Sequence, residues 1–155
     1  MANNPLQWSG LGSAITGLLS SSSSTGLMSL STGCQVRGDE WDNTAQYQYG
    51  DLVVRARGAA AFAAGDYLAG WLLRSNGGVY EDGITATSSA PARAPDFTVP
   101  LRAVAVQQIL IIGPVLLPNC PTRMLVQNLA TKALTTSTGE NGVTIIPYND
   151  NLVSA

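Results

Sequence analysis

The sequence contains no histidine and a single lysine, Lys132. Histidine is the commonest general base and a frequent metal ligand, so its absence excludes Ser/His/Asp and Cys/His catalysis. Charged residues are also scarce, at 12% of the chain, which is about half of the roughly 25% that is usual. Because a free monomer normally carries more surface charge, we expect much of this surface to be covered by copies of the chain or by a larger assembly.

Cysteine occurs only twice, at Cys34 and Cys120. Two cysteines are too few for a disulfide scaffold, and no CxxC or Cys/His spacing is present to hold a metal. We favour the interpretation that both are buried free thiols. A single long-range disulfide between them is the alternative.

Motifs that carry chemistry are missing as well. No GxxxxGK[ST] loop occurs, and no GxGxxG follows an expected strand. The acidic residues Asp39, Glu40 and Asp42 are clustered, but their spacing does not match a calcium loop, and a solvated turn is the simpler interpretation. A glycosidase pair is conceivable at Glu81 with Asp82, or at Glu40 with Asp42, although adjacent loop carboxylates are usually turn formers. We therefore predict no enzymatic activity, no cofactor and no metal.

The charge distribution and the length of the apolar runs limit the kinds of partner that we expect. The net charge is −2, and the arginines are spread along the chain without a dense basic block, so nucleic-acid binding is not expected. The apolar runs are too short to cross a membrane as helices. The opening MANNPLQWSG lacks the basic start and apolar region of a secretory signal. We therefore expect the protein to be made in, and used from, the cytosol.

The stretch 96–127 is the most informative about the fold. Its apolar residues come in runs of four to eight between Pro and Gly. They do not recur at the i, i+3, i+4 spacing that an amphipathic helix needs. Proline cannot donate a hydrogen bond to a central strand ladder. We expect four prolines to lie at strand ends, bulges or connections: Pro100, Pro114, Pro118 and Pro121. The stretch therefore predicts short strands of a mostly antiparallel sandwich.

Other segments add to about seven or eight strands, with no convincing long helix. The expected strands include residues 44–57, 66–75, 97–101, 104–112, 122–129 and 142–148. Within 44–57 the apolar pattern changes phase across Gly50 and Asp51, which indicates a β-bulge. Within 66–75 both faces are apolar, which indicates that both are covered. We predict an all-β, jelly-roll-like antiparallel β-sandwich with an extended N-terminal arm.

The arm is predicted to span residues 1–32, and the sandwich domain residues 33–155. The first segment is rich in Gly, Ser and Thr, but it carries more apolar residues than a pure linker. It is either a flexible leader or an arm that orders on a neighbouring subunit. In the second case deletion of residues 1–30 should remove binding and leave the sandwich folded. The expected anchors of the arm are Leu6, Trp8, Leu11, Ile15, Leu18 and Leu19.

A second expected contact is the loop 76–95, which is rich in Gly, Ser, Ala and Pro. Long loops in compact domains are often functional. We expect this loop to meet another chain, with Tyr80 and Arg93 as its contact residues.

Several segments together carry a family resemblance. They are SLSTG (29–33), DNT (42–44), YLAGWLLRSNGGVYEDG (67–83), PARAPDFTVPLRAV (91–104), VLLPNCPTRMLVQN (115–128) and NGVTIIPYND (141–150). Their order resembles that of small structural proteins of tailed bacteriophages, of the head decoration or cement kind. The resemblance spans about residues 25–150, and none of its pieces is a catalytic signature. The run NCP at 119–121 departs from the Gly- or Lys-containing turn of the pattern, which affects local loop geometry.

This resemblance implies a jelly-roll-like sandwich that adds to the outside of a phage head as a dimer or trimer and links neighbouring capsomers. The implied partners are the major capsid protein and the chain itself, and the implied location is the capsid exterior of the virion. Two alternatives remain: a tail or fibre component, and a carbohydrate-binding sandwich. In the last case the sugar-binding aromatic residues would be Trp41, Tyr47, Tyr49 and Tyr80.

Overall fold

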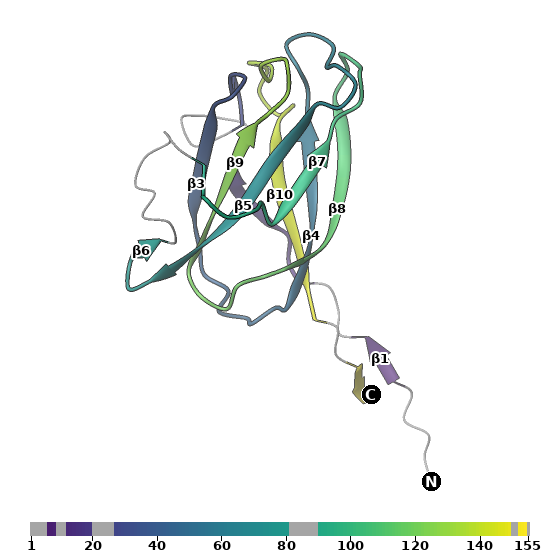
Figure 1. The fold of residues 1–155 in the computed structure, drawn as a ribbon. Helices are drawn as coiled ribbons and strands as arrows, with labels where there is room; N and C mark the ends of the chain where they lie inside the picture. The colour runs from purple at the N-terminus through teal and green to yellow at the C-terminus, as the bar shows by residue number, and fades with distance from the viewer. Residues whose placement is uncertain (1–5, 9–11, 20–26, 81–89, 150–151, 155) are drawn as a thin grey trace.

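The computed structural model describes residues 6–8, 12–19, 27–80, 90–149 and 152–154. These residues form strands and connections and contain no helix. Two antiparallel sheets pack face to face in a sandwich-like arrangement (Figure 1). The all-β sandwich predicted from the sequence is confirmed.

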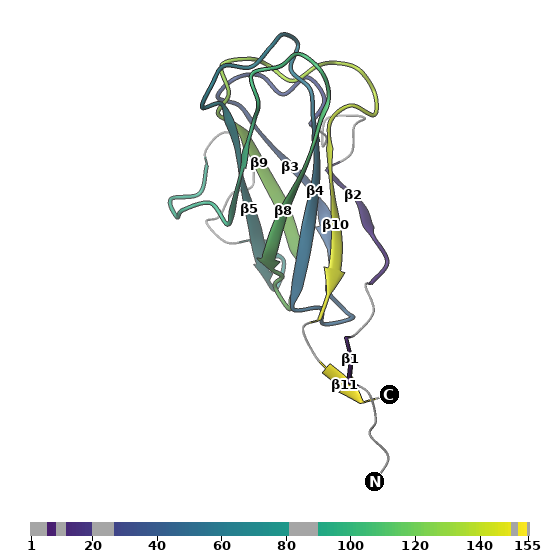
Figure 2. The same cartoon turned by 90° about the vertical axis from the view of Figure 1, so that its right-hand side faces the viewer.

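One sheet has four strands in the order β2-β10-β4-β8, seen side by side in Figure 2. Their bounds are β2 (Ile15–Leu19), β10 (Gly142–Tyr148), β4 (Tyr49–Ala56) and β8 (Gln108–Leu116). The other sheet has the order β3-β9-β5, and two further strands pair with β5. These are β3 (Gln35–Trp41), β9 (Thr122–Asn128), β5 (Tyr67–Asn76), β6 (Val79–Tyr80) and β7 (Phe97–Pro100).

A separate two-stranded ribbon lies outside the sandwich, at one end of the molecule (Figure 1). It pairs β1 (Leu6–Trp8) with β11 (Leu152–Ser154) in an antiparallel register. Neither strand belongs to the two sheets of the sandwich. The first and the last described strands of the chain therefore pair with each other.

The main core lies between the two sheets. In β4, Leu52, Val54 and Ala56 are fully buried, because alternate residues of a strand point to the same face. Leu68 and Leu72 of β5 meet them from the opposite sheet and belong to the same cluster. Truncating one of these leucines to alanine should cost about 2–5 kcal/mol, the usual range for a buried leucine.

Part of the predicted arm belongs to this sandwich, which corrects the boundary at residue 32. Strand β2 pairs with β10, with Ile15 opposite Ile145. Leu19, Leu27 and Leu30 are buried in the main core. These three leucines thus find their partner surface within the same chain, and not on a neighbouring subunit.

The prolines lie where their missing N–H donor predicts. Pro100 ends β7, and Pro118 and Pro121 lie in the connection between β8 and β9. Pro114 lies inside β8, which is an edge strand, at an irregularity in its pairing with β4. The expectation for all four positions is confirmed.

The phase change predicted across Gly50 and Asp51 is absent, because burial alternates without interruption along β4, which begins later than expected. The register between β4 and β8 shifts between Gly50 and Leu52, and the extra residue lies on β8. Residues 44–48 form a turn, because Asn43 Oδ1 accepts a hydrogen bond from Tyr47 N (2.9 Å) and Asn43 Nδ2 donates to Tyr47 O (2.7 Å). Ala45 and Tyr47 therefore precede the strand and do not share a face with Tyr49.

Two other expectations about element bounds were wrong. The acidic segment around Asp39 and Glu40, expected as a solvated turn, lies in β3, where both side chains are exposed. The hydrogen-bonding partner that makes it a strand is β9, which is remote in sequence. Strand β8 begins at Gln108, since the Gln108 side chain closes a loop by bonding Arg102 N (2.8 Å) and Arg102 O (3.0 Å).

The outer face of β5 and β9 is covered by the chain's own loop. Ala69, Trp71, Leu73 and Leu125 form a second buried cluster on the side opposite the main core. Residues 90–96 lie against it: Trp71 Nε1 donates to the carbonyl of Arg93 (3.2 Å). The prediction that both faces of the strand at 66–75 are covered is confirmed.

Candidate interaction surface

The four-stranded sheet has no such cover over its outer face among the described residues. In β8, Ile109 and Ile111 are 66% and 70% exposed, and Leu116 is 64% exposed. Large apolar side chains that are exposed together mark contact sites in soluble proteins. We name this surface the open face; its residues on β4, β8 and β10 are Tyr49, Asp51, Val53, Arg55, Ile109, Ile111, Leu116, Thr144, Ile146 and Tyr148.

The strand register arranges these side chains in rows across the sheet. Val53 lies between Ile111 of β8 and Thr144 of β10. Residues directly opposite each other on antiparallel strands have Cβ atoms about 4.5–5.5 Å apart, so side chains in a row touch. The apolar surface is therefore continuous from β8 across β4.

A second row of side chains lies at one end of the open face, where β4 begins and where β8 and β10 end. Tyr49 lies between Leu116 and Tyr148 in register. The rings of Tyr49 and Tyr148 are stacked, with 5.9 Å between their centroids. This row adds aromatic surface to the aliphatic surface of β8.

Only two charged side chains occur on β4, β8 and β10, all of which the structure describes: Asp51 and Arg55. Asp51 lies against β8, where a Cβ added to Gly113 would be 2.1 Å from Asp51 Oδ1. Gly113 therefore allows the carboxylate to lie flat on the sheet. Within the described residues, no ion pair joins Asp51 or Arg55 to another side chain.

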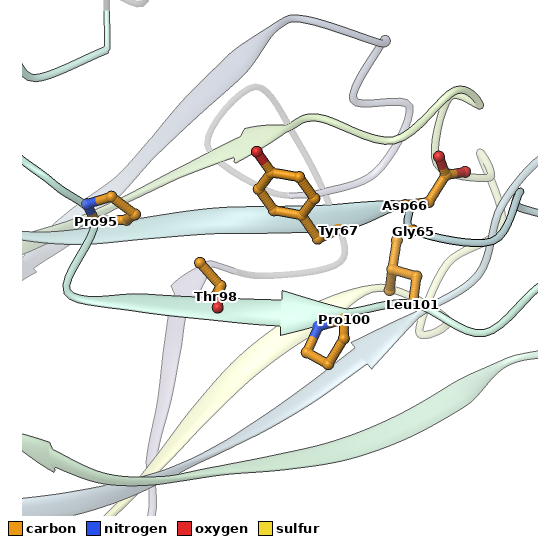
Figure 3. Close-up of a pocket in the computed structure, with 7 residues that line it drawn as sticks. All are labelled: Gly65, Asp66, Tyr67, Pro95, Thr98, Pro100 and Leu101. Carbon is orange, nitrogen blue, oxygen red and sulfur yellow. The ribbon is translucent and has the colours of Figure 1, made fainter.

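A hollow of about 520 Å³ lies on the other sheet, beside β5 and β7 (Figure 3). Its lining includes Tyr67, Thr98 and Pro100, which come from these two strands. Its one acidic lining residue, Asp66, is a structural group: its carboxylate accepts hydrogen bonds from Ala63 N (2.8 Å), Thr131 N (3.0 Å) and Thr131 Oγ1 (2.9 Å).

These contacts determine the protonation of Asp66. Burial raises the pKa of the carboxyl, but the hydrogen bonds from Ala63 and Thr131, with a contribution from the charge of Lys132, outweigh it and leave the pKa below its ordinary value of 3.8. A general acid would need a raised pKa instead. The hollow therefore offers a proline and tyrosine surface without an acid–base pair among the described residues.

The predicted anchors of the arm are found in different places. Leu6 and Trp8 lie in β1, opposite Ser154 and Leu152. Leu19 is buried in the core of its own chain, which excludes it as an anchor on a neighbour. Ile15, half-buried, packs against that core. Leu11 lies outside the described residues, and for Leu18 only the backbone in β2 is described.

Tyr80 and Arg93, predicted as contact residues of the loop, bind their own chain. The guanidinium of Arg123 lies over the Tyr80 ring, 4.8 Å from its centroid, and the Tyr80 hydroxyl donates to the Glu40 carboxylate. Arg93 Nη2 donates to the carbonyl of Leu72 (3.1 Å). The described parts of the loop are thus held against β5 and β9, while its contact with another chain stays a prediction.

The aromatic residues considered for sugar binding do not converge. Trp41 and Tyr47 pack against the main core. Tyr49 lies on the open face, and Tyr80 lies on the other sheet. A sugar site built from these four residues is not supported.

Both cysteines are free thiols, Cys34 exposed and Cys120 half-buried, so the expectation that they are buried was wrong. Among the described residues, no group of three or more His, Cys, Asp or Glu side chains is placed to hold a metal ion. The same residues include no helix of the length and apolar character that a membrane crossing requires.

The open face is the site that the sequence prediction missed. A signal was present in the run ILII at 109–112, which is apolar in both phases of the strand alternation. Such a run indicates cover on both faces, and here the described chain covers one. No family model, curated protein or solved structure matches this chain.

Proposed function

We propose that this protein is a non-enzymatic structural component of a phage particle, a decoration or cement protein that binds the outside of the head. The observation that carries the proposal is the open face, where Ile109, Ile111 and Leu116 are exposed on one edge of the sandwich. Apolar patches of this kind mark protein–protein contacts, so the open face supports a chain that works as a subunit of an assembly. The described residues offer contact area and no reactive cluster.

The strand order supports a jelly roll within the confirmed sandwich. Apart from the two-residue strand β6, the strands of the two sheets run β2-β10-β4-β8 and β3-β9-β5-β7. Jelly rolls consist of two such four-stranded sheets and are found in viral capsid and lectin domains. A fold does not define a function by itself, and the open face supports the use as an assembly protein over the use as a lectin.

The proposed activity is thermodynamic. A subunit that binds the assembled shell, and not its dissociated parts, stabilises the shell by mass action. At a free concentration of 100 times its Kd, each occupied site gains about 2.7 kcal/mol. The implied partner is the major capsid protein, and repetition over the many sites of a head multiplies this modest gain.

The test is the number and position of copies in purified virions of the encoding phage. Gel densitometry should give hundreds of copies per particle, and labelled antibody should decorate the head in electron micrographs. A handful of copies, or label on the tail, would establish a tail or fibre component instead. Absence of the chain from purified virions would refute a structural role altogether.

The carbohydrate-binding alternative has a separate readout. A glycan array should show no binding by the purified protein. Specific binding that is lost in Tyr67→Ser, at the hollow beside β5 and β7, would favour the lectin alternative over the decoration protein.

A further inference from the structure

Strand β4 presents two opposite charges symmetrically about an apolar centre. Asp51, Val53 and Arg55 are alternate residues on the open face. At about 3.3 Å of rise per residue, each charge lies about 7 Å from Val53 along the strand. A two-fold axis that runs across the strands at Val53 therefore exchanges the two positions. The open face is self-complementary in charge.

We propose that a second copy of this chain covers the open face, with the two four-stranded sheets stacked about that axis. Asp51 then meets Arg55 of the partner subunit, and the exchange is reciprocal, so that two ion pairs flank the centre. Sheets packed face to face lie about 10 Å apart with their strands within about 30° of alignment. That spacing leaves room for one interdigitated layer of side chains from each copy.

The two charges also favour a two-fold axis across the strands over one parallel to the strands. A two-fold axis parallel to the strands would place Asp51 on Asp51 of the partner subunit, and like charges in an interface cost several kcal/mol. The axis across the strands avoids this conflict. It also places β8 over β8, with Ile111 at the centre of the contact.

Strand β8 contributes to the apolar centre of the same arrangement. Its residue Ile111 lies opposite Val53 in register and therefore close to the axis. The interface combines an apolar centre with paired charges, which is how closed two-fold contacts reach specificity.

This inference rests on the proposed function only for its use in the particle, where the dimer would be the unit that attaches. The open face would then be buried in the dimer, and the end of the molecule that carries β1 and β11 would remain free for the shell. The dimer itself is a property of the purified chain and is measurable without particles.

The experiment is a reciprocal charge exchange on the full chain, followed by sedimentation equilibrium at micromolar concentration. The wild type should have twice the 16.1 kDa mass of the chain. Asp51→Arg and Arg55→Asp should each raise the dimer Kd about tenfold or more, because each creates like-charge contacts. Mixing these two variants in equal amounts should restore a dimer, since every contact between them is then of opposite charge.

The matched control is Asp39→Arg, the same charge change at an exposed position of the other sheet. It should leave the dimer Kd unchanged. Thermal melts followed by circular dichroism show that each variant is folded. For a variant that fails to fold, Ile111→Ser is the substitute, and it should also raise the Kd.

Three results would overturn the proposal: a monomeric wild type, a trimer, or a dimer that is indifferent to all these substitutions. A dimer that behaves as expected while the chain is absent from virions would retain the inference and refute the proposed function.

Discussion

Gly70 lies directly beneath the ring of Phe97, its register partner on β7. A Cβ added to Gly70 would be 2.0 Å from Phe97 Cζ, which is closer than two carbon atoms can approach. The buried ring occupies the space that any larger side chain at residue 70 would need. At the scale of single residues, this pair determines how closely β7 packs on β5.

We expect Gly70→Ala to reduce the free energy of unfolding by about 1–3 kcal/mol, because overpacking forces the ring or the backbone to move. Urea denaturation measures the change. In the Phe97→Leu background the same substitution should cost less, since the atom that it strikes is gone. An equal cost in both backgrounds would show that the ring is not the cause.

Asp66 makes the stability of the sandwich depend on pH. Its pKa in the folded chain is lowered from 3.8, so ionisation of this group stabilises the fold above pH 3.8 and the contribution is lost as the pH falls through the folded pKa. Asp66→Asn should unfold at a lower urea concentration than the wild type at pH 7. The difference should shrink as the pH is lowered below 3.8, and a difference that is constant with pH would contradict this assignment.

At the scale of elements, the segment before β3 is tied into the sandwich by a buried amide. Asn128 Nδ2 donates to the carbonyl of Leu30 (2.9 Å) and to that of Lys132 (3.0 Å). Its Oδ1 accepts a hydrogen bond from Ala130 N (3.0 Å). These contacts hold Leu30 in the core and explain why a segment with the composition of a linker is ordered there.

Two N-terminal truncations separate the ribbon from the core. Deletion of residues 1–11 removes β1 and should leave the unfolding temperature nearly unchanged. Deletion of residues 1–30 also removes β2 and three core leucines, at about 2–5 kcal/mol for each buried leucine. That sum is comparable with the whole stability of about 5–15 kcal/mol of a typical domain. The longer truncation should be unfolded by circular dichroism, contrary to the expectation from sequence; a folded one would contradict the placement of β2.

At the scale of the whole molecule, the two sheets differ in how their outer faces are covered. Residues 90–96 cover Trp71 and Leu125 on one sheet. On the other sheet, Ile109 and Ile111 are exposed. The sandwich is thus complete in its core but asymmetric in its surface, and the proposed dimer uses the uncovered side.

The double variant Ile109→Ser/Ile111→Ser should separate assembly from folding. Exposed positions contribute little to the stability of the monomer, so the free energy of unfolding at submicromolar concentration should change by about 0.5 kcal/mol or less. Dimerisation should be lost in sedimentation equilibrium. The control is Leu52→Ser, in the core between the sheets, which should instead lose most of the stability. A dimer that survives in the double variant would place the contact elsewhere.

Local chemistry alone located several parts of the fold. The predicted strand at 142–148 coincides with β10. The prolines marked strand ends, connections and the irregularity in β8, because proline has no backbone N–H to donate. The position of β3 was not predictable in this way. Its residues are polar and acidic, and they form a strand only because β9 supplies their hydrogen bonds. The same holds for β8, whose start depends on the Gln108 contact with Arg102.

By itself the sequence determined that this protein is built of strands and has no histidine-dependent chemistry, since short apolar runs between Pro and Gly favour strands over helices and an absent residue type cannot act. Only the tertiary structure decided which apolar residues are inside. Leu19 and Leu27 of the expected arm are buried, while Ile111 of the expected strand 104–112 is exposed. The physical reason is that alternation shows which side chains share a face of a strand, whereas the cover over that face comes from segments far away in the chain.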